Sequence, residues 1–294
     1  MCTDSTEIAL LGEEARAIMK KVDIGGIDVA YRDEGRVDGT PIVLSHSLFF
    51  DSSMFEELAA RYVARGFRVV AYDHPGQGRS GDATTDQLAV DALTSVAAGL
   101  INRLDLGPVH FVGNSLGGMV AVRLVARRPE LLRSAVALGS SARSEQKVVE
   151  YAPLATHLTA HGASERADII STIMFGDDTL AENGEIVRRW RDHITALPPR
   201  IGPAVKGVIY RGDMDNELRL ERATGSRVVP VLAIAGEQDH AYEPAIAADH
   251  MAAATAGRSV VLPGCGHSVA LEKPNEVFEE TIEFFAETTE PGAV

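Results

Sequence analysis

Short apolar runs alternate with amphipathic stretches over most of this 294-residue chain, with one long interruption. The apolar runs have the length and the bounding turn residues of buried strands. We expect strands at residues 27–32, 42–45, 68–72, 109–112, 134–138, 228–235 and 259–262. The stretches between them carry apolar residues at the spacing of one helix face. They predict helices at residues 7–20, 53–63, 84–104, 116–128, 244–255 and 274–287.

The alternation stops after Ser140 and resumes at Val228. Between these points the pattern favours helices only, at residues 147–160, 164–175, 184–197 and 216–223, with a hinge at Pro198-Pro199. Strands that alternate with helices predict a mainly parallel sheet covered by helices on both faces. We therefore expect one α/β core, residues 1–139 and 228–294, with a helical cap at residues 140–227 inserted between two strands.

Two polar pairs predict where helices begin. Ser53 with Glu56, and Thr84 with Gln87, have the spacing of a capping box. In that motif, each side chain of the pair accepts a hydrogen bond from the other residue's backbone N–H. We expect one helix to be capped at Ser53 and the next at Thr84.

Composition and charge exclude several kinds of partner. The net charge of −14 argues against nucleic acid and anionic membranes. No apolar run approaches the ~20 residues of a membrane span, and residues 1–21 lack the apolar core of a signal peptide. The two cysteines, Cys2 and Cys265, form no disulfide framework. We expect a cytoplasmic monomer or homodimer that acts on a small molecule, without a nucleic-acid or membrane partner.

The turn from Gly113 to Gly117 is the first candidate for chemistry. It has the form Gly-x-Ser-x-Gly around Ser115, with an apolar strand before it and a helix after it. Such a turn projects one serine hydroxyl from a strained corner, where small neighbours let the strand and the helix approach closely. The alternative interpretation makes Ser115 a plain helix N-cap. The strand before the turn and the helix after it favour a nucleophile.

Four loops that follow expected strands should meet at one edge of the sheet, because the carboxyl ends of parallel strands lie together. They contain Ser115 and residues 45–48, 236–239 and 264–267. A serine, an acid and a histidine therefore reach one place in that chain order. This order is the one expected for a nucleophile on a strand–turn–helix corner.

The histidine loop supplies the candidate base. His267 has glycine neighbours that leave its ring free to reach the hydroxyl of Ser115. His46 and His74 are alternatives on the same rim. We expect His46 to brace the loop after its strand and to contribute to the substrate site, and His74 to line the loop beyond the next strand.

The acid that orients the histidine has two candidates. Asp239 is the better placed to hold the imidazole in the correct tautomer, and Glu237, two residues earlier, is its competitor. An acid after the strand at residues 134–138 would be an alternative, but the loop there, Gly139-Ser140-Ser141-Ala142, contains no acidic residue.

Backbone N–H groups next to the nucleophile should bind the oxyanion of an acyl-transfer reaction. We expect them from Leu48 and Leu116. Phe49 and Phe50 extend the same loop and are candidate walls of an apolar pocket. Trp190, in the expected cap, is either a lid over this pocket or part of the packing of the cap.

These motifs resemble the α/β-hydrolase fold over nearly the whole chain. The resemblance is carried by residues 113–118, by the loop at 73–80, by Gly236-Glu237-Gln238-Asp239 and by Gly266-His267-Ser268. Within that superfamily the chain is most similar to capped carboxylesterases, enol-lactonases and meta-cleavage-product hydrolases. One position departs from the family: His46 is followed by Ser47, where glycine is usual, and we expect the Ser47 side chain to restrict the oxyanion loop.

The resemblance implies acyl transfer, because dehalogenases and epoxide hydrolases of this fold use an aspartate in place of Ser115. We expect a hydrolase of an ester or lactone of a small, largely apolar compound. The sequence shows no zinc-ligand spacing, phosphate loop or dinucleotide motif, so no metal and no cofactor is expected.

Two other functions stay open. One is carbon–carbon bond hydrolysis of the meta-cleavage-product type. That group usually has tryptophan after the base histidine, where this chain has Ser268, and places an arginine for a substrate carboxylate in the cap. Arg188, Arg189 and Arg191 are candidates for that arginine, although such a run is typical of a solvated helix face. The other function is a ligand receptor with little turnover.

Overall fold

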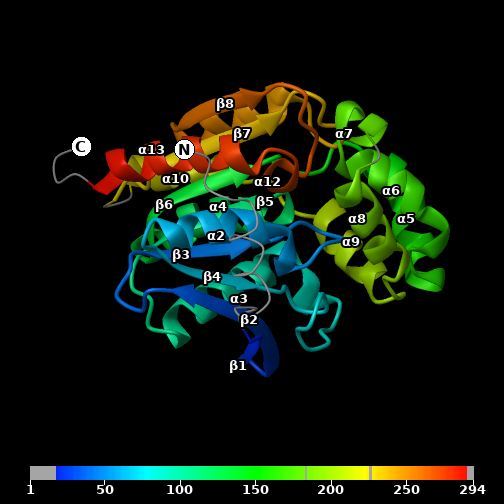
Figure 1. Ribbon diagram of the computed structural model, residues 1–294, viewed down its shortest axis with the longest axis horizontal. Helices are drawn as coiled ribbons and strands as arrows, with labels where there is room; N and C mark the ends of the chain where they lie inside the picture. Colours follow the sequence, from blue (N-terminus) through cyan, green and yellow to red (C-terminus); the bar gives the residue numbers. More distant parts are fainter. Residues whose placement is uncertain (1–17, 183, 225–226, 290–294) are drawn as a thin grey trace, which may run out of the picture.

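The computed structural model describes residues 18–182, 184–224 and 227–289. Within them one sheet has the strand order β1-β2-β4-β3-β5-β6-β7-β8 (Figure 1). The strands are β1 Lys20–Ile24, β2 Ile27–Gly35, β3 Pro41–Ser45, β4 Arg68–Tyr72, β5 Val109–Asn114, β6 Leu132–Leu138, β7 Val231–Gly236 and β8 Arg258–Leu262. β2 runs antiparallel to β1 and β4, and every other pair is parallel. The predicted mainly parallel sheet is confirmed.

Every residue of β3, β5 and β7 is buried. Helices cover both faces of these strands, so their sequences are nearly continuous apolar runs. β1 was not predicted, because it is a mostly exposed edge strand with only Val22 and Ile24 packed against the core. A helix was expected at residues 7–20. Residues 7–17 lie outside the described part of the chain, and Lys20, the last residue of that range, begins β1 instead.

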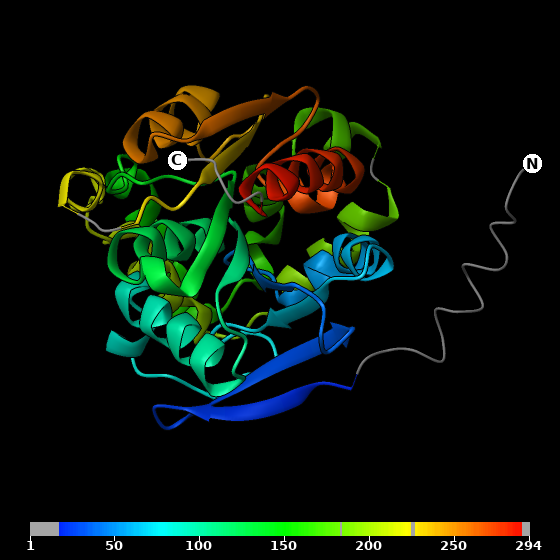
Figure 2. The same ribbon diagram turned by 90° about the vertical axis from the view of Figure 1, so that its left-hand side faces the viewer.

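Helices pack on the two faces of the sheet as expected (Figure 2). The core helices are α2 Glu56–Ala64, α3 Val90–Arg103, α4 Leu116–Arg127, α10 Asp215–Thr224, α11 Met251–Thr255, α12 Val269–Glu272 and α13 Pro274–Thr289. α2 packs beside α13 on one face, and α3, α4, α10 and α11 form a continuous layer on the other. This arrangement fixes which ends of the strands stay open for a site.

The chain between β6 and α10 folds into helices that gather at one end of the molecule (Figure 1). They are α5 Val148–His161, α6 Ala167–Met174, α7 Asp177–Glu182, α8 Glu185–Thr195 and α9 Ile201–Ile209. α9 was not predicted: its apolar residues are interrupted by Gly202, Pro203 and Gly207, which have low helix propensity. Packing of α9 against α5 outweighs that propensity.

α10 packs on α4 and α11 of the core. An ion pair of 2.7 Å between Arg127 Nε and Glu217 Oε2 joins α10 to α4, and the N–H of Met214 donates to the carbonyl of Ala142. The cap boundaries of residues 140–227 stay a prediction, and these contacts favour an end of the cap near Ile209.

One helix start differs from the prediction. Asp51, not Ser53, caps the turn before α2: its Oδ1 accepts the N–H of Ser53 at 2.9 Å and the hydroxyl of Ser53 at 2.6 Å. The carboxylate of Glu56 pairs with Arg32 and Arg189 instead of returning to the helix start. The capping box at Ser53 was therefore wrong, because the longer-range ion pairs draw Glu56 away.

The second polar pair has the expected reciprocal bonds. The N–H of Thr84 donates to Gln87 Oε1 at 2.9 Å, and the N–H of Gln87 donates to Thr84 Oγ1 at 3.4 Å. The box precedes a short 3₁₀ turn, Asp86–Leu88, and α3 begins only at Val90, so the helix start expected at Thr84 was wrong.

Candidate active site

The loop between β5 and α4 holds Ser115 in a strained conformation. Ser115 has φ of 52° and ψ of −110°, a region that residues with side chains rarely adopt. Glycine is required on either side of it. A Cβ at Gly113 would overlap the backbone of Gly117, and a Cβ at Gly117 would overlap the carbonyl oxygen of Ser45. The two glycines thus allow the strand and the helix to approach closely, and the strained turn places the serine hydroxyl beside His267.

Ser115, His267 and Asp239 form a continuous hydrogen-bonded chain. The hydroxyl of Ser115 lies 2.7 Å from Nε2 of His267. Nδ1–H of the same ring donates to Asp239 Oδ2 at 2.9 Å, which leaves Nε2 as an acceptor for the serine proton. Ser115 is 6% exposed and His267 3% exposed, so this chain is shielded from bulk water.

Asp239, rather than Glu237, reaches the histidine. The other oxygen of Asp239, Oδ1, accepts the N–H groups of Ala241 at 2.8 Å and Tyr242 at 2.9 Å. The carboxylate is therefore fixed on both oxygens. Glu237 is exposed, and its Oε2 accepts the N–H of Gly264 instead.

Leu116 follows Ser115 directly, and Leu48 follows Ser47, whose hydroxyl is bonded to Asn114; both leucines are buried. Among the described residues nothing accepts a hydrogen bond from the N–H of Leu48 or Leu116. The N–H of Leu116 belongs to the first turn of α4, where the helix dipole favours negative charge. A buried donor without an acceptor costs about 1–3 kcal/mol, so these two groups are available to a ligand oxygen.

His46 and His74 lie beneath the loop that carries Leu48. Nδ1–H of His46 donates to the carbonyl of Ser47 at 2.7 Å, and its Nε2 accepts the N–H of His74 at 2.8 Å. Both rings are completely buried, and burial lowers both pKa values. His46 has no free nitrogen for a substrate. The expected substrate contact is replaced by the bracing role, because both ring nitrogens are already used by the backbone.

The aromatic residues of the expected pocket lie between the cap and the core. Phe49 follows Leu48 in a left-handed conformation, with φ of 72°. The ring of Phe50 packs on Trp190 of α8, with 4.6 Å between the ring centroids. Trp190 is 2% exposed, and its packing on Phe50 joins α8 to the loop that carries Leu48.

Asn114, which sequence reasoning missed, joins three of the loops at the site. Its Nδ2 donates to the hydroxyl of Ser47 at 3.0 Å and to the carbonyl of His267 at 2.9 Å, and its Oδ1 accepts the N–H of Ala270 at 3.1 Å. Ser47, where the family usually has glycine, is thus part of the framework. The sequence signal that could have indicated the role of Asn114 was its position directly before Ser115.

A buried ion pair also borders the site. Arg211 Nη1 lies 3.1 Å from Glu145 Oε2, which also accepts the hydroxyl of Tyr242 at 2.7 Å. Burial raises the pKa of Tyr242, so its hydroxyl stays protonated and donates. The ring of Tyr242 packs against His267 at 5.6 Å between centroids. These partners are far apart in sequence, and no local pattern indicated them.

The described part of the chain contains no cluster of three or more histidine, cysteine or acidic side chains that could hold a metal ion. Among its helices, none is long and apolar enough to cross a membrane.

Residues 42–281 match the model of the alpha/beta hydrolase family, and the chain belongs to that family. The chain is 26% identical over 270 residues to a Mycobacterium tuberculosis protein named as a non-heme bromoperoxidase, BpoC, covering 88% of this chain and 98% of that one. A protein of Mycobacterium phage D29 named as a non-heme haloperoxidase is 36% identical over 121 residues, 40% of this chain. That match spans 43% of the phage protein, less than half of its length.

The crystal structure of an enol-lactonase from Burkholderia xenovorans LB400 superposes with a TM-score of 0.81 at 26% identity. The superposition covers 91% of this chain and 100% of that one. Family and fold thus agree with the resemblance seen in the sequence, and they identify the chain as a hydrolase of this superfamily.

Proposed function

We propose that this protein is a serine hydrolase that cleaves a carboxylic ester or lactone through an acyl-enzyme on Ser115. The observation that carries the proposal is the Ser115–His267–Asp239 chain of hydrogen bonds, together with the N–H groups of Leu48 and Leu116, for which the described residues offer no acceptor. Nucleophile, base, orienting acid and oxyanion donors are the complete set that acyl transfer requires.

The reaction follows from these positions. Nε2 of His267 takes the proton of Ser115 as the serine oxygen attacks the substrate carbonyl, and the negative oxygen binds the two N–H groups. The histidine then gives that proton to the departing alcohol, and the ester bond to Ser115 remains. A water molecule, deprotonated by His267, attacks this ester; the acid is released, and His267 returns the proton to the oxygen of Ser115. Asp239 stabilises the charged imidazole in both halves.

A small, largely apolar substrate is supported by the closed position of the nucleophile and by the aromatic residues after Leu48. Ser115 is only 6% exposed, so a small substrate reaches it more readily than a bulky one. Phe49 and Phe50 are buried and follow directly on the oxyanion donor. The cytoplasmic location and the monomeric or homodimeric state remain predictions.

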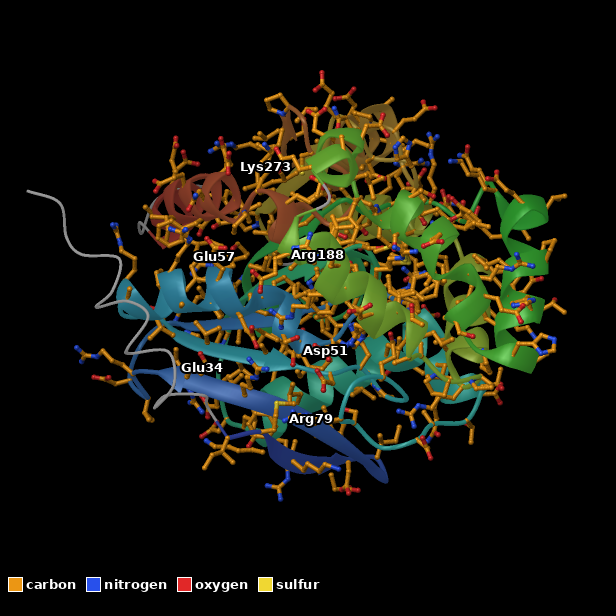
Figure 3. All side chains as sticks on the ribbon, turned by 45° about the vertical axis from the view of Figure 1, so that its right-hand side comes forward. Glu34, Asp51, Glu57, Arg79, Arg188 and Lys273 are labelled. Atoms are coloured by element: carbon orange, nitrogen blue, oxygen red, sulfur yellow. The ribbon has the colours of Figure 1, made fainter. Side chains whose placement is uncertain are left out.

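The carbon–carbon alternative has less support. Arg188, Arg189 and Arg191 are all exposed on α8 (Figure 3 labels Arg188). Arg189 pairs with Glu56 and Arg191 with Asp168, both at the protein surface. This run therefore fits a solvated face better than a carboxylate site beneath the cap.

The experiment is hydrolysis of short p-nitrophenyl esters and of a small lactone by the purified protein, beside a meta-cleavage-type dienone. We expect turnover of the ester or the lactone with a burst equal to the enzyme concentration. Turnover of the dienone alone would favour carbon–carbon cleavage. Binding without turnover of any of them would favour the receptor.

A further inference from the structure

A segment of the cap lies directly against the loop that carries His267. The carbonyl of Met174 accepts both the N–H of Ser268 at 2.9 Å and the hydroxyl of Ser268 at 2.6 Å. The two backbones approach so closely that a Cβ at Gly266 would overlap the N–H nitrogen of Gly176. Ser268 therefore faces the cap and not the substrate, and the histidine loop rests on residues 174–179.

Glu272, one turn beyond Ser268, joins these two backbones. Its Oε2 accepts the N–H of Gly176 at 2.9 Å and the hydroxyl of Thr179 at 2.6 Å, both from the cap. Its Oε1 accepts the N–H of Ser268 at 3.2 Å. A carboxylate can accept several donors at once, and charge strengthens each bond. Figure 3 labels Lys273, the next residue along the chain, where the core meets the cap.

The same cap segment reaches the loop of the catalytic acid. The N–H of Asp178 donates to Gln238 Oε1 at 3.0 Å, and the carboxylate of Asp177 lies 2.9 Å from Nε2 of His240. Gln238 and His240 are the neighbours of Asp239. Residues 174–179 therefore contact the flanks of both the acid and the base.

We infer that Glu272 is a positioning residue for His267, and that it acts by tying the histidine loop to cap residues 174–179. The inference rests on the proposed serine-hydrolase function. Glu272 touches no reacting atom. It fixes the backbone on which the imidazole swings between the serine and the leaving group, where a displacement of about 1 Å is enough to reduce the rate by about 100-fold. The cap thus contributes to chemistry as well as to selectivity.

The test replaces Glu272 by glutamine, which keeps the size but puts an N–H₂ group where one acceptor oxygen stood. Glu276→Gln is the matched control, because Glu276 is exposed and the change removes the same charge. Thr179→Val removes the cap hydroxyl that donates to Glu272 and leaves the sequence of the histidine loop unchanged. For each protein, active sites are titrated with a phosphonate, and kcat and KM are measured per titrated site on a p-nitrophenyl ester.

We expect Glu272→Gln to lower kcat per titrated site and the rate of phosphonate labelling together, by about tenfold to 100-fold. KM should change by less than about twofold, and Thr179→Val should show a smaller loss of the same kind. Glu276→Gln should match the wild type. An unchanged kcat per titrated site in Glu272→Gln, with only fewer active molecules, would overturn the inference, because Glu272 would then only support folding. A wild type that takes up no phosphonate would overturn the proposed function first, and this inference with it.

Discussion

The loop edge of the sheet and the helices α5 to α9 of the predicted cap are held by different kinds of contact. At the edge, backbones meet directly: Gly113 and Gly117 leave no room for a Cβ, and parallel strands fix the order of the loops. The cap is joined to the core through side chains, and several of these pairs are exposed, such as Arg189 with Glu56 and Arg200 with Asp82. Exposed pairs contribute about 0–1 kcal/mol each.

The two kinds of contact suit two different tasks: holding the reacting groups in place and admitting the substrate. A geometry set by backbone contacts suits the reacting groups, which have to be held to a fraction of an ångström. A set of weak side-chain contacts suits a cover that opens for substrate. Residues 174–179 and Gly207 are exceptions, because there the cap meets the core through the backbone: a Cβ at Gly207 would overlap the carbonyl oxygen of Leu88. Changes at the edge should therefore affect rate, and changes in the rest of the cap should affect selectivity.

The largest effect is expected for Ser115→Ala. Loss of the nucleophile costs on the order of 10⁶ in kcat in a comparable serine hydrolase, because the triad acts as a unit. The fold should be intact, since only a hydroxyl is removed. Ser95→Ala, an exposed serine on α3, is the control. Activity of Ser115→Ala within about tenfold of the wild type would exclude Ser115 as the nucleophile.

Next in size is the change of the acid. Asp239→Asn should reduce kcat by roughly 10⁴, the effect of the wrong imidazole tautomer in a studied serine protease. Glu237→Gln should be mild, because Glu237 is exposed and accepts the N–H of Gly264 instead of reaching the histidine. Steady-state kinetics on both folded proteins provide the comparison. A larger loss in Glu237→Gln would transfer the orienting role to Glu237.

In the cap, Trp190→Ala should change the relative kcat/KM of short, medium and aromatic esters by about 1–3 kcal/mol at most, the range for discrimination by an apolar pocket. The reason is its packing on Phe50 beside the oxyanion loop. Phosphonate labelling of Ser115 should survive this substitution. Trp190→Phe should change the relative kcat/KM by less than Trp190→Ala does. An equal change for all esters would mean that Trp190 only supports the cap.

The smallest effect concerns the pH dependence of the free energy of unfolding, through His110 in the core. Burial lowers the pKa of His110 to about 3, so the folded protein keeps it neutral. As pH falls below about 6.5, the unfolded chain binds a proton that the folded chain does not, and stability falls by up to ~1.4 kcal/mol per pH unit. His110→Gln should lower this slope between pH 6.5 and 5.5 in urea unfolding. An unchanged slope would show that His110 titrates alike in both states.

The sequence predicted the edge better than the cap, for a physical reason. Strand period, turn glycines and chain order are local signals, and they were enough to bring Ser115, Asp239 and His267 to one place. The contacts of Glu145 with Arg211, or of Glu272 with Thr179, join residues that are far apart in the chain and have no local pattern. α9 was missed because tertiary packing outweighs its glycines and its proline.

The bracing role of His46 was visible only in part, because its bonds go to the backbone of Ser47 and His74. Backbone partners require no particular side chain, so the sequence carries no mark of them. The same holds for the proposed oxyanion donors: the sequence indicated Leu48 and Leu116 by their positions, but only the structure shows that both N–H groups lack an acceptor among the described residues.

The most direct test of the account is intact-protein mass spectrometry after incubation with a fluorophosphonate. The account predicts one adduct per wild-type molecule, located by peptide mapping at Ser115, and none on Ser115→Ala under the same conditions. An equal adduct on Ser115→Ala, or a wild-type protein that stays unlabelled while it hydrolyses esters, would contradict it.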